Sequence, residues 1–420
     1  MAESIESFCE FLRIKSISSE GPKGSYTEAV NWLINYVETK LKLPYDVITI
    51  HQNKPILVVK WEGKDPSLPR IILNSHYDVV PVMREHWTCD PFSAVRTDDG
   101  KIYGRGSQDM KCVCIQYLEA VRQLLKKGIS PLRTMYLTFV PDEEIGGTEG
   151  MVSFVKSDFW KSMQPIGFAF DEGLACPENA FTVFYGERIP WWLLIKAKGP
   201  TGHGSRFIES TAIEKLMNVC NQALKFRQEQ KGILGDGCSH AIAKKLGDVT
   251  SLNLTMLKSG VSLDEGKTYA INVVPTEASA GFDVRISPTM QPEEFKSLID
   301  DWCKEEGVSW EYAPWITPQT AHYVSSLDRN VNPWYGLFLD TIKDNFNVPV
   351  EAEIFPAGTD SQNFRRLGIP VLGFSPMRNT PILLHEHNEW IHEDTFIEGI
   401  GIYEVVIEKF VMAQKFSTEK

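Results

Sequence analysis

The sequence lacks any long run of apolar residues. Apolar runs such as 71–73, 135–140 and 191–195 stop far short of the roughly 20 residues that span a bilayer. The first residues, 1–6, carry acids early and have neither the basic start nor the apolar core of a signal peptide. We therefore expect no membrane association and no secretion.

Positive charge and paired cysteines are also scarce. The chain has 43 basic against 55 acidic residues, a net charge of -12, which argues against nucleic acids and anionic membranes as partners because both need a concentrated positive field. The eight cysteines are scattered, and Cys112 and Cys114 form the only close pair. Neither a disulfide framework nor a Cys-x-x-Cys zinc site is indicated, and a reducing cytoplasm is the expected setting.

What the sequence does contain is the pattern of a folded α/β enzyme. With 420 residues and 43% hydrophobic content, the chain can bury a sizeable core. Apolar spacing predicts helices and strands in alternation, with polar residues at the strand ends. These elements are a helix over 25–41, strands over 46–50, 56–61 and 70–73, a helix over 111–127 and a strand over 134–140. Such an order predicts an α/β fold with a central sheet flanked by helices and ligands at one sheet edge.

The pattern changes near Arg188 and resumes after Trp310. Between them, a strand from Trp191, a helix over 211–228, a strand pair over 249–257 and 278–286, and a helix over 291–306 predict a compact α+β unit. Beyond it follow a helix over 334–345 and strands over 350–355 and 371–374. We therefore predict a catalytic domain formed by residues 1–188 and 311–420, with a two-layer α+β domain inserted at 189–310.

Histidine and acidic residues follow the predicted strands. His76 and Asp78 come after the strand 70–73, and side chains two apart in an extended chain point the same way, so Asp78 can orient the imidazole. For this pair alone, a capping aspartate beside a structural histidine is about as good an explanation. Asp109 lies between a glycine-rich turn and a helix, where it could bridge two cations or simply cap the helix.

Three further acidic or histidine-bearing segments occupy similar positions. Glu143 and Glu144 follow the strand 134–140, Glu172 follows an apolar stretch ending at Phe170, and a His-Glu-His segment begins at His385. An acidic loop taken alone is usually just solvated. Repeated clusters at strand ends are hard to explain as caps, whereas a two-metal hydrolase site needs such ligands together with one free carboxylate to handle a proton.

Several motifs together carry a family resemblance over nearly the whole chain. The strongest are Ser75–Pro81, Gly104–Cys112, Asp142–Gly147, Ala357–Asp360 and Leu372–Pro376, with further matches at Phe181–Arg188, Trp191–Trp192 and Thr380–His387. In this order they resemble the zinc-dependent aminoacylase and carboxypeptidase family of metallopeptidases, and its aminoacylase members most.

The resemblance implies two zinc ions per subunit. It assigns His76, Asp109 and Glu172 to one ion, and Asp109, Glu144 and His385 to the other. Glu143 would act as general base on a metal-bridging water, with Asp78 behind His76. His385 is preferred over His387 only because the family places the ligand histidine a few residues before a glutamate, here Glu389; geometry leaves both open. His387 is expected to be structural and His392 to lie on the surface.

The inserted domain is implied to be a lid and a dimerisation domain. In the family, the histidine matching His203 reaches the partner subunit's site and would steady the tetrahedral oxyanion, so a homodimer is expected. Asn272 and Arg285 match substrate-contacting positions. Arg285 could pair with the substrate carboxylate in a bidentate manner, although an arginine on a solvated strand face is nearly as good an explanation.

The activity implied is hydrolysis of N-acyl-L-amino acids to a free amino acid and a carboxylate. A dipeptidase or carboxypeptidase of the same family would use the same metals on a different substrate. A catalytically silent binding protein is the alternative from another class, and the complete ligand set with Glu143 argues against it. A serine hydrolase is disfavoured because the sequence around Ser205 does not fit the Gly-x-Ser-x-Gly turn.

Overall fold

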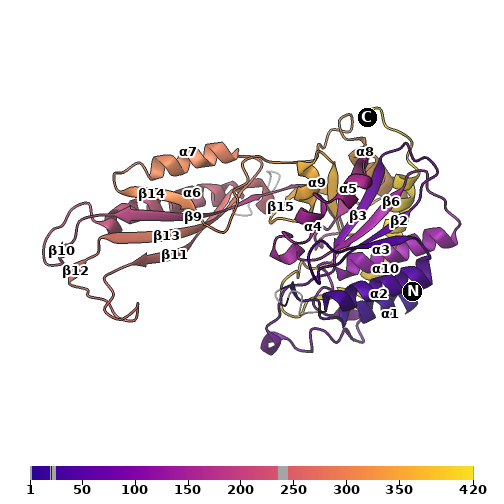
Figure 1. Ribbon diagram of the computed structural model, residues 1–420, viewed down its shortest axis with the longest axis horizontal. Coiled ribbons are helices and arrows are strands. Elements are labelled where there is room, and N and C mark those ends of the chain that lie inside the picture. The colour runs from indigo at the N-terminus through magenta and orange to yellow at the C-terminus, as the bar shows by residue number, and fades with distance from the viewer. Residues whose placement is uncertain (1, 19, 21–24, 235–244, 420) are drawn as a thin grey trace. The chain divides into compact units, whose positions relative to one another are not determined.

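The chain divides into two compact units in a computed structural model that describes residues 2–18, 20, 25–234 and 245–419 (Figure 1). Unit 1 comprises residues 1–185, 324–352 and 359–420, and unit 2 comprises residues 186–323 and 353–358. The second unit is thus inserted into the first. Residues 311–323, predicted as part of the catalytic domain, belong with unit 2. There the Ala313 amide bonds the Trp192 carbonyl at 2.8 Å and Trp191 Nε1 bonds the Gln319 carbonyl at 2.9 Å. The second border therefore lies further along the chain than position 310.

An eight-stranded sheet forms the centre of unit 1. Its strand order is β1-β2-β6-β3-β7-β16-β8-β15. The bounds are β1 Tyr45–Ile48, β2 Ile56–Trp61, β3 Arg70–His76, β6 Met135–Val140, β7 Ile166–Asp171, β8 Phe181–Glu187, β15 Val350–Phe355 and β16 Val371–Phe374. Strands β6, β3, β7 and β16 run parallel, whereas β1, β2 and β8 pair antiparallel with their neighbours. The predicted mixed α/β sheet is confirmed.

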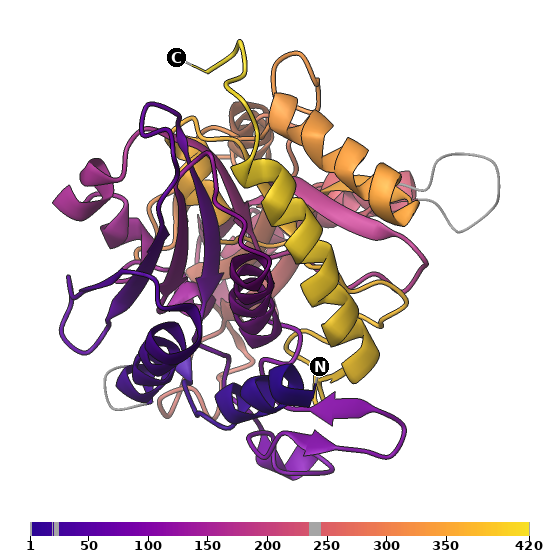
Figure 2. The same ribbon diagram turned by 90° about the vertical axis from the view of Figure 1, so that its right-hand side faces the viewer.

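Helices cover both faces of this sheet. Their bounds are α1 Ala2–Leu12, α2 Tyr26–Tyr36 (continued by a π-turn over Val37–Leu41), α3 Lys111–Lys126, α4 Met151–Phe154, α5 Asp158–Ser162, α8 Pro333–Phe346, α9 Ser361–Arg366 and α10 Glu393–Val411. Helix α10 packs on α3 and α8, as Figure 2 shows from the side. Alternate strand residues explain the two layers: Ile71 and Leu73 join the core under α1, α3 and α10, while Ile72 joins the core under α4, α5 and α9.

Smaller elements complete unit 1. A three-stranded sheet has the order β17-β5-β4, with bounds β4 Val95–Arg96, β5 Lys101–Tyr103 and β17 Trp390–His392. Short 3-10 turns cover Arg84–His86 and Glu143–Ile145. Among the residues that the structure describes, no helix combines the length and apolar character needed to cross a bilayer.

Unit 2 is a two-layer α+β structure. Its antiparallel sheet has the order β11-β13-β9-β14, and a two-stranded pair joins β10 and β12. The bounds are β9 Ile189–Lys198, β10 Gly202–His203, β11 Ser251–Ser259, β12 Val273–Val274, β13 Glu277–Ile286, β14 Val308–Tyr312, α6 Ala212–Leu234 and α7 Pro292–Trp302, with a 3-10 turn at Leu246–Asp248. Every second residue of β9, from Ile189 to Ala197, is buried in the core shared with α6 and α7. Helix α7 ends four residues earlier than the helix predicted to reach Glu306.

Candidate metal centre

The parallel strands of unit 1 deliver the predicted side chains to one edge of the sheet. Strand β3 ends at His76, β6 is followed by Glu143 and Glu144, and β7 is followed by Glu172. Because parallel strands share their carboxyl edge, these residues lie close together. Asp109 enters from the turn before α3, whose N-cap is Met110, so the aspartate is not the helix cap.

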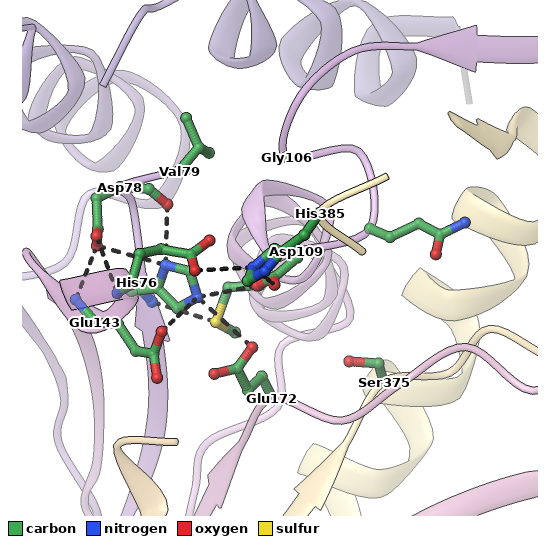
Figure 3. Close-up of polar contacts among 12 residues, drawn as sticks. His76, Asp78, Val79, Gly106, Asp109, Glu143, Glu172, Ser375 and His385 are labelled. Atoms are coloured by element: carbon green, nitrogen blue, oxygen red, sulfur yellow. Dashed lines mark hydrogen bonds and ion pairs between the residues drawn. The ribbon is translucent and has the colours of Figure 1, made fainter. Parts of the chain in front are cut away.

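Two groups of three side chains could each hold a cation. His76, Asp109 and Glu172 form the first triad, and Asp109, Glu144 and His385 form the second triad. Within each triad, the possible ligand atoms all lie within 4.8 Å of one another. Asp109 belongs to both: Oδ1 lies 3.1 Å from His76 Nε2, and Oδ2 lies 3.2 Å from His385 Nε2 (Figure 3). His76 Nε2 is 3.6 Å from Glu172 Oε2, and His385 Nε2 is 2.9 Å from Glu144 Oε2.

The remaining histidines of the C-terminal segment lie apart from both triads. The His387 ring packs on the His86 ring, with centroids 5.0 Å apart. His392 caps α10, its ring accepting a hydrogen bond from the Asp394 amide. The structure therefore brings His385, and neither of the other two, to the acidic edge.

Asp78 supports the site differently from the sequence-based expectation. The closest acceptor of His76 Nδ1 is the Asp78 backbone carbonyl at 3.0 Å, while the Asp78 carboxylate lies 3.5 Å away. That carboxylate accepts the backbone amides of Glu143 at 3.2 Å and Glu144 at 3.3 Å. One residue thus orients the imidazole and also holds the loop that carries both glutamates.

Glu143 lies beside the first triad without belonging to either. Its Oε2 is 3.9 Å from His76 Nε2 (Figure 3). Burial, and then the Glu172 carboxylate, raise the pKa of Glu143 well above its usual value. Burial and then Asp109 likewise raise the pKa of Glu172 well above its usual value. The raised pKa values favour the neutral acids, and the ionised carboxylates that a metal site needs would require nearby positive charge to offset their burial.

The acidic side chains also raise the pKa values of the two imidazoles, His385 and His76. Hydrogen bonds to Asp109 and then Glu144 raise the pKa of His385 to about 10. Burial works to lower the pKa of His76, yet Glu172 and Asp109 raise it well above its usual value. Buried Glu144 Oε1 has no hydrogen-bond partner among the described residues. The donor set, nitrogen and oxygen with one shared carboxylate, fits a pair of divalent cations.

Two buried acids near the centre were not found by sequence reasoning as site residues. Asp171, at the end of β7, is held by Asn74 at 3.0 Å and Ser361 at 2.7 Å. Asp360 is buried, and its Oδ2 has no hydrogen-bond partner in the described part of the chain. Burial and then Asp171 raise the pKa of Asp360 well above its usual value. In the sequence, only two features pointed to Asp360: it follows the predicted strand 350–355, and it ends the family motif Ala357–Asp360.

The predicted residues of unit 2 form two separate places. His203 and Asn272 are exposed and adjacent: His203 pairs in register with Val273, and the Gly204 amide bonds the Asn272 carbonyl at 2.8 Å. The His203 ring contacts Ser205 Oγ at 2.7 Å. Arg285 lies on β13, where it bonds the Asp283 carboxylate at 2.8 and 3.0 Å and stacks over Trp192.

The carboxyl edge of the sheet, the shared aspartate and the adjoining free glutamate are typical of a hydrolase that uses two metal ions. The profile of Peptidase family M20/M25/M40 matches residues 72–409. Aminoacylase-1 of Dictyostelium discoideum is 47% identical over 410 residues, covering 97% of this chain and 98% of that protein. The chain therefore belongs to peptidase family M20/M25/M40 and, within it, to the aminoacylase-1 group of amidohydrolases.

Solved structures of that family share the fold. An M20 family metallo-carboxypeptidase of Sulfolobus solfataricus superposes with a TM-score of 0.70 at 18% identity, covering 98% of this chain and 100% of the other. A dinuclear metal-binding M20 peptidase of Bacillus subtilis superposes with a TM-score of 0.63 at 14% identity, covering 98% of both chains. The family resemblance carried by the sequence motifs is confirmed.

Proposed function

We propose that the protein hydrolyses N-acyl-L-amino acids to a free L-amino acid and a carboxylate, using two zinc ions and Glu143 as general base. The observation that carries this proposal is the pairing of two triads through Asp109, with Glu143 beside them and outside both. One triad would be His76, Asp109 and Glu172, and the other Asp109, Glu144 and His385. Membership of the aminoacylase-1 group supports the substrate class.

The chain's own residues would divide the chemistry between them. Zinc held by the triads would act as a Lewis acid, which would polarise the acyl carbonyl and lower the pKa of water from about 15.7 toward about 7. Glu143 takes a proton from the attacking water and returns it to the leaving nitrogen. This role needs an ionised Glu143, and positive charge in the triads would favour that form against the burial that raises its pKa. Asp78 keeps Glu143 in reach through the backbone amide.

A substitution that leaves the triads intact tests the role of Glu143. Glu143→Gln removes the base and keeps the shape, so we expect two cations per chain with turnover of N-acetylmethionine lowered about 100-fold or more. Glu62→Gln is the matched control because Glu62 is an exposed acid on the surface of unit 1. Full turnover by Glu143→Gln with both cations present would rule the assignment out.

The same assay decides between substrate classes. We expect N-acetylmethionine to be cleaved with a much higher kcat/KM than simple dipeptides containing methionine. The reverse preference would make the protein a dipeptidase or carboxypeptidase of the family. Bound cations without hydrolysis of any acyl-amino acid in a broad panel would instead indicate a silent binding protein.

We further propose that the protein works as a homodimer through unit 2, in the cytoplasm. His203 would enter the partner subunit's site and donate a hydrogen bond to the tetrahedral oxygen, a contribution of a few kcal/mol for one such donor. Asn272, adjacent to His203, and Arg285 would contact the substrate, and Arg285 would exchange part of its pairing with Asp283 for the substrate carboxylate. Exposure of His203 beside Asn272 supports this arrangement. The described cysteines are free thiols, which supports a reducing compartment.

Mixed dimers test the sharing of His203. A His203→Ala subunit paired with a Glu143→Ala subunit should retain one complete site per dimer, although each homodimer has none. Each mixed dimer would hold one complete site and one site that lacks both side chains. We therefore expect a mixed dimer to show roughly half of the turnover of a wild-type dimer. Complete inactivity of the mixed dimers would show that His203 acts within its own subunit.

A further inference from the structure

His385 is carried by a segment without regular structure. Residues 381–389 form neither helix nor strand, and His385 and Asn388 have φ of 62° and 58°, in the left-handed region. For non-glycine residues that region costs of order 1 kcal/mol or more, so it persists only where surrounding contacts impose it. The His385 side chain is 49% exposed. Packing alone therefore does not hold the imidazole in place.

The other histidine ligand has a different kind of support. His76 ends a central parallel strand, and its side chain is only 1% exposed. Its Nδ1 bonds the Asp78 carbonyl at 3.0 Å. The first triad is therefore held by the sheet itself, whereas the second depends on whatever fixes the segment 381–389.

A buried ion pair fixes that segment. Arg105 and Glu389, with side chains 2% and 0% exposed, join through Nη1 and Oε2 at 2.7 Å. The second nitrogen of the same guanidinium, Arg105 Nη2, donates to the His385 carbonyl at 3.3 Å. The guanidinium also stacks over the Trp87 ring. One side chain thus connects Glu389 to the backbone of the ligand histidine.

Glu389 also holds the turn before α3 that carries the shared Asp109. Its carboxylate accepts the backbone amides of Gly106 at 3.2 Å, Gln108 at 2.6 Å and Asp109 at 3.3 Å, and the Ser107 hydroxyl at 3.3 Å. Five donors converge on this single carboxylate, because Arg105 adds the fifth. The turn before α3 and the segment of His385 are some 280 residues apart in sequence, and they meet at Glu389.

We propose that Arg105 and Glu389 are positioning residues, and that Arg105 affects one of the two cation sites whereas Glu389 affects both. Arg105 fixes His385 and so controls the cation held by Asp109, Glu144 and His385. Glu389 fixes the turn of Asp109 and so affects both cations. This inference rests on the proposed function, in which both triads bind cations.

Stepwise cation binding to the full chain tests the proposal. Zinc is titrated into chelator-stripped protein, and stoichiometry and affinity are measured by calorimetry; the step lost in His385→Ala identifies the second cation. Arg105→Lys keeps the charge and the pairing with Glu389 but cannot also reach the His385 carbonyl with the same fork. We expect the second cation to bind about 10- to 100-fold more weakly, as is usual when a group behind a ligand is lost, and the first to bind as in wild type.

A second substitution and a control make the result specific. Glu389→Gln replaces one carboxylate oxygen, which accepts hydrogen bonds, by an amide nitrogen, which donates them. Both cations should therefore bind more weakly. Arg378→Lys is the matched control, because Arg378 forms an ion pair with Glu398 in the same C-terminal region and touches neither triad. A general loss of structure would weaken the binding of both cations to Arg105→Lys and lower its Tm, whereas the proposed role weakens only the second binding step.

Each outcome is decisive. Two cations bound by Arg105→Lys with wild-type affinities, or both weakened equally, would overturn the role of Arg105. If that variant does not fold, Gln108→Ala is tested in its place. The side-chain amide of Gln108 donates to the Pro381 and Trp390 carbonyls at 3.1 and 2.8 Å and so holds the same segment. This substitution should weaken the second cation alone. Failure of the wild-type chain to bind two cations would refute the proposed function itself.

Discussion

Cation binding should compete with protons, and the second triad sets the size of the effect. The pKa of His385 is raised to about 10 by its bonds to Asp109 and Glu144. Burial, and then the Asp109 carboxylate, raise the pKa of Glu144 to about 7. A cation binds neutral imidazole and ionised carboxylate. Near pH 7 it must therefore displace one proton from His385 and about half a proton from Glu144.

The sign and magnitude follow from this proton count. Because protons leave when the cation binds, affinity rises with pH. One to one and a half protons correspond to an increase of about 10- to 30-fold per pH unit around neutrality, or roughly 1.4 to 2 kcal/mol. Well above the pKa of Glu144 the increase should settle near tenfold per unit, since only the His385 proton remains to be displaced.

Calorimetry in two buffers of different ionisation enthalpy measures the count directly. The difference between the two observed heats gives the number of protons released per cation at about pH 7, where the predicted value lies between one and 1.5 for the second step. His387→Asn is the control, because His387 lies on His86 away from both triads; its count should match wild type. Affinity that is independent of pH, or that falls as pH rises, would refute the reasoning.

Three further predictions concern the site and its support. Asp109→Asn removes the negative charge shared by both triads, so elemental analysis should find fewer than one cation per chain; two tightly bound cations would exclude sharing. Lys54→Met leaves the buried Asp142 carboxylate without its ion pair, so urea unfolding should show a loss of about 3 kcal/mol or more, while Lys60→Met at an exposed pair should cost less than about 1 kcal/mol. Leu118→Ala, fully buried on α3, should cost about 2–5 kcal/mol in the same assay.

The sequence predicted the part of the site that the parallel sheet builds. His76, Glu144 and Glu172 could be placed together because each follows a strand, and parallel strands end at one edge. Asp109 and His385 needed the family resemblance, since a turn before a helix and an irregular segment leave many directions open. His385 adopts a left-handed backbone that no apolar pattern indicates.

Other features could not be read from the chain because they depend on long-range contacts. Glu389 is one of two acids in an irregular segment, and only the fold brings five donors to it. The role of the Asp78 carboxylate in holding Glu143 and Glu144 was likewise invisible, because nothing local distinguishes it from an acceptor for the imidazole. Helix α10 was not predicted, although the spacing of its buried residues Phe396, Ile400, Tyr403 and Ile407 is typical of an amphipathic helix.

The insertion of unit 2 has a consequence for the order in which the protein is made. The Ser325 amide bonds the Tyr185 carbonyl at 2.7 Å, so the chain enters the main part of unit 2 and comes back from it at neighbouring positions of unit 1. The apolar core of unit 2 lies within residues 189–312, whereas β16 pairs with β7 across some 200 residues. During synthesis the inserted unit can therefore complete its core while the larger sheet still lacks a central strand. The two triads, which need residues from His76 to His385, are among the last features that the growing chain can assemble.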